Sequence, residues 1–177
     1  PSEITTRYTD MHWLRSGSFG EAWSAYDPSN GRSPVVIKIF YTTTATGIRY
    51  LTRNLVARSR SLRNAVQEAV TECELANKIA TKGPDGDPGR NRVVKCLKNK
   101  ADRSRPADHA LYLVLEHGGT SVEEWIKDES YRATVDEKRK VVGQLLQGLR
   151  TMGELLPQKL VHHDLKPANS VYDGTTA

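Results

Sequence analysis

Residues 161–170 read VHHDLKPANS, and three side chains in this stretch have complementary chemistry. Asp164 carries a carboxylate, Lys166 an ammonium group and Asn169 an amide, and their spacing lets them converge on one reacting group in a compact loop. Asp164 could then accept a proton from an attacking hydroxyl, Lys166 could neutralise charge on a transferred phosphoryl group, and Asn169 could ligate a metal ion. The stretch predicts a phosphoryl-transfer loop, which needs a nucleotide site elsewhere in the chain.

Composition limits the classes of protein to which the chain can belong. The chain has 177 residues, of which 37% are hydrophobic and 27% charged, as expected for one globular domain or two small lobes. No apolar run approaches the roughly 20 residues of a membrane span, so we expect none. With Cys73 and Cys96 as its cysteines, the chain gives no basis for proposing a disulfide framework or a four-ligand zinc site, and we predict a reducing, intracellular setting.

Hydrophobic periodicity predicts an α+β fold. From Tyr8 to Phe40 apolar and polar residues alternate, and GSFG (17–20) and DPSNG (27–31) interrupt them, which predicts three strands joined by two turns. Ser61 to Ala80 has apolar residues at helical spacing and should form a helix packed on that sheet. Two short apolar runs predict the remaining strands of a five-stranded antiparallel sheet: Val93 to Leu97 and Leu111 to Leu115.

The pattern changes after Glu116, where HGG (117–119) indicates a hinge-like break. Thr120 or Ser121 can cap a short helix that carries Trp125 and Ile126. A longer helix should begin after Thr134, with Glu137 completing a capping box, and should end at Pro157. Its predicted apolar face contains Val141, Val142, Leu145, Leu149, Met152 and Leu156.

Two features in the first half of the chain suit a nucleotide. Gly17 and Gly20 place glycines in a turn, where a bare backbone can approach phosphate oxygens, although an ordinary glycine hairpin has the same pattern. Lys38 lies inside the apolar strand VVIKIF (35–40), where its ammonium group must reach solvent or meet an anion. Glu72 is the best carboxylate partner for it in the predicted helix, and Glu68 is the alternative.

Taken together, the glycine turn, the strand lysine, the helix glutamate and the DLKPAN loop resemble the N-terminal two-thirds of a eukaryotic-type protein kinase domain of the serine/threonine class. The resemblance implies a bilobal fold with an N-lobe at residues 1–115, a hinge at 116–119 and the beginning of a C-lobe at 120–177. It also implies ATP and Mg²⁺ as cofactors, and transfer of the γ-phosphoryl group to a hydroxyl of a protein substrate.

The resemblance further implies roles for individual residues. Asp164 would be the catalytic base, assisted by Lys166, and Asn169 a magnesium ligand. Lys38 would contact the α/β-phosphates and pair with Glu72. The complete set of implied nucleotide contacts, with Leu115 as gatekeeper, Glu116 to Gly118 as hinge and Val171 in the adenine floor, is Leu14, Gly17, Ser18, Phe19, Gly20, Ala22, Ile37, Lys38, Glu72, Leu115, Glu116, His117, Gly118 and Val171.

Several positions depart from the family pattern. Arg15 replaces the first loop glycine, and His163 stands where many kinases have arginine. The 177 residues contain no Asp-Phe-Gly motif, and Asp173 lies in an expected turn, so we expect these residues alone to lack phosphotransfer activity. Two alternatives to a protein kinase stay open, namely a nucleotide-binding pseudokinase or scaffold, and a small-molecule kinase of related fold.

An arginine-rich insertion lies between Lys38 and Glu72, at about residues 41–63. Five arginines occur there without an acidic residue between Tyr41 and Gln67: Arg49, Arg53, Arg58, Arg60 and Arg63. The simplest interpretation is a solvated insertion. The functional alternative is a contact with an acidic or phosphorylated partner along Arg49–Arg63, and nucleic acid is the less favoured ligand.

Overall fold

The computed structural model describes residues 2–17, 20–40, 43–44, 47–48, 62–82, 93–100, 111–128, 132–154 and 165–174. The chain divides into two compact units. The first, here called the sheet unit, comprises Pro1–Leu75 and Lys95–His117. The second, here called the helical unit, comprises Ala76–Val94 and Gly118–Ala177.

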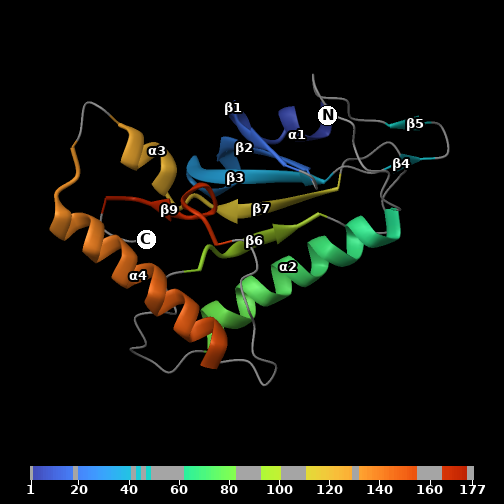
Figure 1. Ribbon diagram of the computed structural model, residues 1–177. Coiled ribbons are helices and arrows are strands. Elements are labelled where there is room, and N and C mark those ends of the chain that lie inside the picture. The colour runs from blue at the N-terminus through green and yellow to red at the C-terminus, as the bar shows by residue number, and fades with distance from the viewer. Residues whose placement is uncertain are drawn as a thin grey trace. The chain divides into compact units, whose positions relative to one another are not determined.

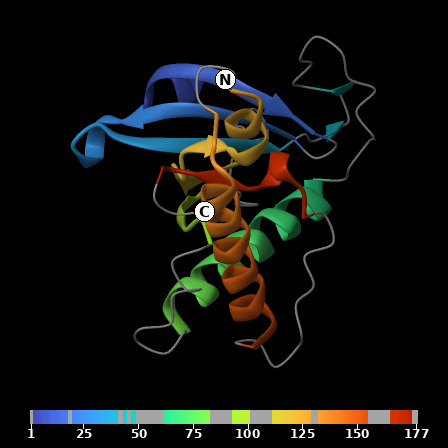
Figure 2. The ribbon, with the colours of Figure 1, turned by 60° about the vertical axis from the view of Figure 1, so that its left-hand side comes forward.

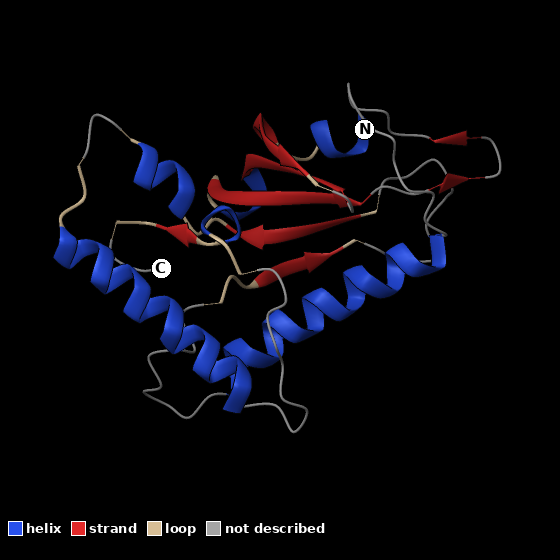
Figure 3. Ribbon diagram, in the orientation of Figure 1, coloured by secondary structure: helices blue, strands red, loops and turns tan. Residues whose placement is uncertain are grey.

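The sheet unit contains a five-stranded sheet with the order β1-β2-β3-β7-β6, which Figure 1 shows side by side. Every neighbouring pair is antiparallel, so the predicted α+β class and five-stranded antiparallel sheet are confirmed. Figure 3 separates these strands from the helices by colour. The strands are β1 (Thr9–Ser16), β2 (Gly20–Asp27), β3 (Ser33–Phe40), β6 (Cys96–Asn99) and β7 (Tyr112–Glu116).

The predicted turn between the second and third strands is present and contains a short 3-10 helix, η1 (Pro28–Asn30). Asp27 caps it, because its carboxylate accepts hydrogen bonds from the backbone N–H and the hydroxyl of Ser29, at 3.0 and 2.6 Å. Gly31 ends the turn at a φ of 60°, a left-handed conformation that glycine adopts without strain. The DPSNG sequence therefore forms the turn that its residue types predict.

One face of the sheet packs into a core cluster with the N-terminal segment. The helix α1 (Ser2–Thr5) contributes Ile4, and Tyr8 follows it, both almost completely buried. Burial raises the pKa of the Tyr8 phenol, which lies edge-on to the Tyr112 ring. The sequence did not predict this helix. The cluster consists of Ile4, Tyr8, Ala25, Val35, Ile37, Ile39, Tyr112 and Val114.

The predicted helix after the insertion is confirmed as α2 (Leu62–Lys82). Among the described side chains of its first half, Ala65, Val66 and Ala69 are buried. A disulfide joins Cys73 of α2 to Cys96 of β6, with a Cα–Cα distance of 5.1 Å. The cysteine count did not predict this bridge, and the cysteines no longer support the predicted reducing setting, because disulfides persist in oxidising compartments.

The arginine-rich insertion is described only in part. It contains the two-residue strands β4 (Thr43–Thr44) and β5 (Gly47–Ile48), which pair antiparallel. Residues 49–61 and the side chain of Arg63 lie outside the described part of the chain, so the predicted acidic or phosphorylated partner stays a prediction.

From Gly118 onwards the helical unit contains two short strands and a short helix. Strand β8 (Thr120–Ser121) pairs with β9 (Val171–Tyr172), and Ser121 caps helix α3 (Val122–Lys127) in a capping box with Glu124. Figure 2 shows α3 beside β9, where the Trp125 and Tyr172 rings lie 5.0 Å apart. The predicted short helix is confirmed, and of the two predicted caps, Thr120 and Ser121, Ser121 is the one that caps it.

The predicted longer helix is α4 (Val135–Glu154). Thr134 and Glu137 form its capping box, with Thr134 Oγ1 accepting from the Glu137 N–H at 3.2 Å and Glu137 Oε2 accepting from the Thr134 N–H at 2.7 Å. The predicted apolar face is wrong at Val142, which is 55% exposed, whereas Val141 is buried. Leu156 and Pro157 lie outside the described residues.

None of the helices in the described part of the chain combines the length and the apolar character that a membrane span requires.

Candidate functional site

The glycine turn connects β1 to β2 in the sheet unit. Gly17 donates its N–H to the Gly20 carbonyl oxygen at 2.8 Å, which closes the turn. A side chain at Gly20 would collide with the backbone carbonyl of Ile39, whereas one at Gly17 would meet open space. Gly20 therefore permits close packing of β2 on β3, and Gly17 leaves one side of the backbone uncovered. Ser18 and Phe19 lie outside the described residues.

Lys38 and Glu72 meet in the structure. The Lys38 ammonium nitrogen donates to Glu72 Oε2 at 2.5 Å, and the two side chains are 30% and 39% exposed. The same nitrogen lies 5.2 Å from the centre of the Phe40 ring, which follows two residues later on the same face of β3. Of the two carboxylates that the sequence left open as partners, Glu72 makes this ion pair.

The open face of β3, defined here as the face that carries Lys38, also carries apolar side chains. Ala22 of β2 pairs directly with Lys38, and Leu115 of β7 pairs with Val36, so cross-strand register places these residues on one face. Ala22, Val36 and Leu115 are all half-buried. This face offers a cation next to a shallow apolar surface.

Ile37 does not belong to this face. Its side chain is completely buried in the core cluster on the opposite side of the sheet. Successive residues of a strand point to opposite faces, so the β3 residue that accompanies Lys38 is Val36. Strict alternation in VVIKIF was the signal that could have found Val36 and excluded Ile37.

Leu14 and the hinge residues complete the predicted contacts of the sheet unit. Leu14 is 44% exposed on β1. Glu116 ends β7, donates its backbone N–H to the Lys95 carbonyl at 2.9 Å and accepts from the Lys95 N–H with its carboxylate at 3.3 Å. His117 is the last residue of the unit. The end of β7 is thus fixed by backbone and side-chain bonds to the segment before β6.

Gly118 and Val171 meet in the helical unit. A side chain at Gly118 would collide with Val171 and press on Val94, so glycine allows these valines to pack on its backbone. Gly119 adopts a φ of 96°, and a side chain there would collide with the backbone of Tyr172. The two glycines of HGG therefore meet steric requirements set by β9 and by Val94.

The loop that precedes β9 is ordered by its own backbone. It contains the 3-10 helix η3 (Pro167–Asn169), in which the Asn169 N–H donates to the Lys166 carbonyl at 2.9 Å. Ser170 is buried, and its carbonyl accepts from the Val122 N–H at 2.9 Å, which ties the loop to the start of α3. The side chains of Lys166 and Asn169 are exposed. This places the two residues on one short loop.

Lys166 also acts electrostatically on α3. The Glu123 carboxylate pairs with Lys127 at 2.6 Å, and this hydrogen bond lowers the pKa of Glu123, with the Lys166 charge adding to the effect. Asp164, His162 and His163 lie outside the described residues, so the catalytic-base prediction is untested. Among the described residues, no three His, Cys, Asp or Glu side chains gather as metal ligands, and Asn169 as a magnesium ligand stays a prediction.

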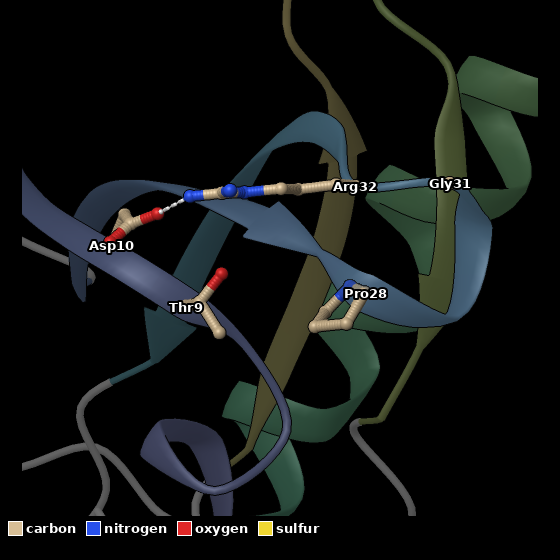
Figure 4. A pocket seen from close by; sticks show the side chains of 5 residues that line it. All are labelled: Thr9, Asp10, Pro28, Gly31 and Arg32. Carbon is tan, nitrogen blue, oxygen red and sulfur yellow. Dashed lines mark hydrogen bonds and ion pairs between the residues drawn. The ribbon is translucent and has the colours of Figure 1, made fainter.

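A cavity of about 590 Å³ opens at the other end of the β1–β2 hairpin from the glycine turn (Figure 4). Asp10 and Arg32 face each other across it in an ion pair of 2.6 Å, and the Arg32 guanidinium lies 5.4 Å from the centre of the Tyr26 ring. Thr9, Pro28 and Gly31 complete the lining. Because both charges are already paired, the cavity presents no uncompensated charge to a ligand.

Neither the models of known protein families nor the sequences of curated proteins match this chain.

Proposed function

We propose that this protein is a serine/threonine kinase, which transfers the γ-phosphoryl group of Mg-ATP to a hydroxyl of a protein substrate. We also propose a protein-kinase-like fold with an N-lobe at residues 1–115, a hinge at 116–119 and the beginning of a C-lobe at 120–177. The observation that supports the proposal most is the Lys38–Glu72 ion pair. The carboxylate is supplied from α2, far along the chain, and holds the ammonium group on the open face of the sheet. An ordinary surface lysine does not need such a partner.

The open face has the chemistry that a nucleotide requires. Adenine is flat and apolar on its faces, and Ala22, Val36 and Leu115 provide a half-buried apolar surface of matching character. The phosphates are anionic, and Lys38 provides a cation next to that surface. The uncovered backbone at Gly17 can donate further hydrogen bonds to phosphate oxygens.

In the proposed reaction the substrate hydroxyl oxygen attacks the γ-phosphorus, the bond from this phosphorus to the ADP oxygen breaks, and the hydroxyl proton passes to Asp164. Lys166, exposed on the η3 loop, would neutralise charge on the transferred group. Asn169 would be one of the ligands of Mg²⁺, which neutralises phosphate charge when bound. Glu72 would keep Lys38 extended towards the phosphates.

The test is a comparison of two variants with a matched control. Asp164→Ala should abolish transfer of labelled phosphate from ATP to serine and threonine peptides while nucleotide affinity stays near the wild-type value. Lys38→Met should abolish transfer because the phosphates lose their cation. Lys95→Met removes an exposed lysine of the same unit and should leave activity unchanged. Full activity in either of the first two variants would refute the assignment.

The same assays separate the alternatives. Nucleotide binding without phosphotransfer by the intact protein would identify a pseudokinase or scaffold. Phosphorylation of small hydroxyl compounds in place of peptides would identify a small-molecule kinase.

A further inference from the structure

A disulfide links α2 to the sheet. The chain has 2 cysteines, and both are used in this bridge. Cys73 lies on α2 and is 7% exposed, and Cys96 lies on the edge strand β6 and is 6% exposed. The bridge therefore fixes the middle of a helix to one edge of the sheet.

The bridge lies next to the ion pair of the candidate site. Cys73 directly follows Glu72 in the chain, so the covalent anchor is one residue away from the carboxylate that binds Lys38. Cys96 pairs with Leu115, and Leu115 pairs with Val36, two residues before Lys38. Both ends of the bridge thus connect to the elements that carry the two charges.

Buried side chains also hold α2. Among its described residues, Ala65, Val66 and Ala69 are buried before Cys73, and Ile79 is buried after it. The Lys38–Glu72 pair is about one-third exposed on each side, and ion pairs of that kind stabilise little. The bridge is the covalent restraint next to Glu72 in the chain, and the ion pair alone would hold the carboxylate only weakly.

We propose that the Cys73–Cys96 disulfide is a redox switch: the oxidised bridge holds Glu72 against Lys38, and reduction releases the middle of α2 and disengages the pair. Its effect on activity rests on the proposed kinase function, whereas its effect on α2 does not. The predicted consequence for phosphotransfer is full activity in the oxidised protein and lower activity after reduction.

The reductant is a small thiol of the glutathione class. One thiolate attacks a sulfur of the bridge, which breaks the S–S bond, forms a mixed disulfide and frees one cysteine thiolate. A second thiol attacks the mixed disulfide, releases the oxidised small disulfide and frees the other cysteine. Two electrons pass from the two small thiols to the bridge, and the two cysteine thiolates take up the two protons. Because both cysteines are buried, attack requires local opening of α2.

The experiment compares hydrogen exchange of the intact protein in the oxidised state, after reduction by glutathione, and after reoxidation. Alkylation and mass measurement confirm the state of both cysteines. Reduction should speed amide exchange in α2 around Glu72, and reoxidation should reverse it. The Cys73→Ala/Cys96→Ala variant should exchange like the reduced protein, and added glutathione should not change its exchange rates. Strand β2 (Gly20–Asp27) should keep its protection in every state.

Two further readouts connect the helix to the site. Acylation of the Lys38 amine should accelerate on reduction, because Glu72 no longer holds it, while Lys127, which pairs with Glu123 in the other unit, should react at an unchanged rate. Phosphotransfer should fall on the order of tenfold on reduction, a usual size for coupling between sites.

The possible results decide both proposals. Equal exchange of α2 and equal Lys38 acylation in the two redox states would overturn the switch, and so would loss of protection throughout the sheet, which would make the bridge purely structural. Faster exchange of α2 without phosphotransfer in either state would support the switch and refute the kinase function. Phosphotransfer that ignores the redox state, with faster α2 exchange, would refute the coupling to activity.

Discussion

The buried carboxylate of Asp27 forms an ion pair with Lys98, and removing that lysine should weaken the fold. Lys98 of β6 donates to Asp27 Oδ2 at 2.6 Å, and the Asp27 side chain is 4% exposed. Lys98→Met keeps most of the aliphatic stem and removes the cation, while both hydrogen bonds from Ser29 remain. Asp27 then keeps a buried charge with one partner fewer.

The magnitude follows from the burial of the two groups. A hydrogen bond to a charged group contributes about 1.5–3 kcal/mol to stability. The Lys98 side chain is 36% exposed, so water already screens part of the interaction and the lower half of that range applies. We expect Lys98→Met to lower the free energy of unfolding at pH 7 by about 2 kcal/mol.

The effect should depend on pH in a defined direction. The hydrogen bond from Lys98, followed by that from the Ser29 hydroxyl, lowers the pKa of Asp27 below its usual value. A carboxylate with a depressed folded-state pKa adds stability above its unfolded-state pKa of about 3.9, and that contribution is lost as the pH falls through the folded-state pKa. The difference between wild type and Lys98→Met should therefore be full at pH 7 and shrink below pH of about 4.

Urea unfolding followed by tryptophan fluorescence at pH 7 and at pH 3 measures both effects. Lys95→Met, an exposed lysine three residues away, is the matched control and should change stability by less than about 0.5 kcal/mol. The reasoning is refuted if Lys98→Met is as stable as Lys95→Met at pH 7. A deficit of equal size at both pH values would refute the assignment to Asp27.

Two further predictions concern single contacts. Gly20→Ala should lower the free energy of unfolding by about 2 kcal/mol, because the new methyl group would collide with the Ile39 carbonyl. Gly17→Ala in the same turn should lower it by less than about 1 kcal/mol, and equal urea midpoints for the two variants would contradict this. Thr134→Ala should lower the free energy of unfolding by about 1 kcal/mol, because it removes the hydroxyl that accepts from the Glu137 N–H. The loss should appear as a lower melting temperature, and Thr134→Ser should retain most of the wild-type stability.

Local signals predicted the elements whose structure depends on local chemistry. The first three strands follow from alternation and from two turns with glycine, proline and asparagine, and all three form. The capping box of Thr134 and Glu137 was readable because each residue bonds to the backbone of the other within one turn. Lys38 was conspicuous because a charge inside an apolar strand needs a partner.

Features that depend on contacts between distant parts of the chain could not be predicted from the sequence. The strand predicted at Val93 to Leu97 is β6 (Cys96–Asn99), because its register on β7 pairs Lys98 with Val114 and Asn99 with Leu113. Such pairing overrides the local apolar run. The disulfide likewise depends on α2 lying along β6, and no local pattern reveals this.

The buried side of α4 shows a different limit of prediction from the sequence. Its buried residues are Val141, Gln144, Gly148 and Thr151, a narrow stripe in which only one side chain is strongly apolar. A prediction based on apolar spacing therefore selected Val142, which points outward. The stripe itself keeps helical spacing, so periodicity was present but composition concealed it.

Strand β3 shows how one short sequence can serve both the fold and the candidate chemistry. Its odd-numbered residues Val35, Ile37 and Ile39 are buried in the core cluster and hold the strand in the centre of the sheet. Because neighbouring side chains point to opposite faces, this leaves Lys38 on the open face, where Glu72 meets it. Each apolar residue thus fixes the position of the polar one beside it, and a shift of one residue in register would bury the cation and expose the core. The rigidity of the core face is what gives the lysine a defined position.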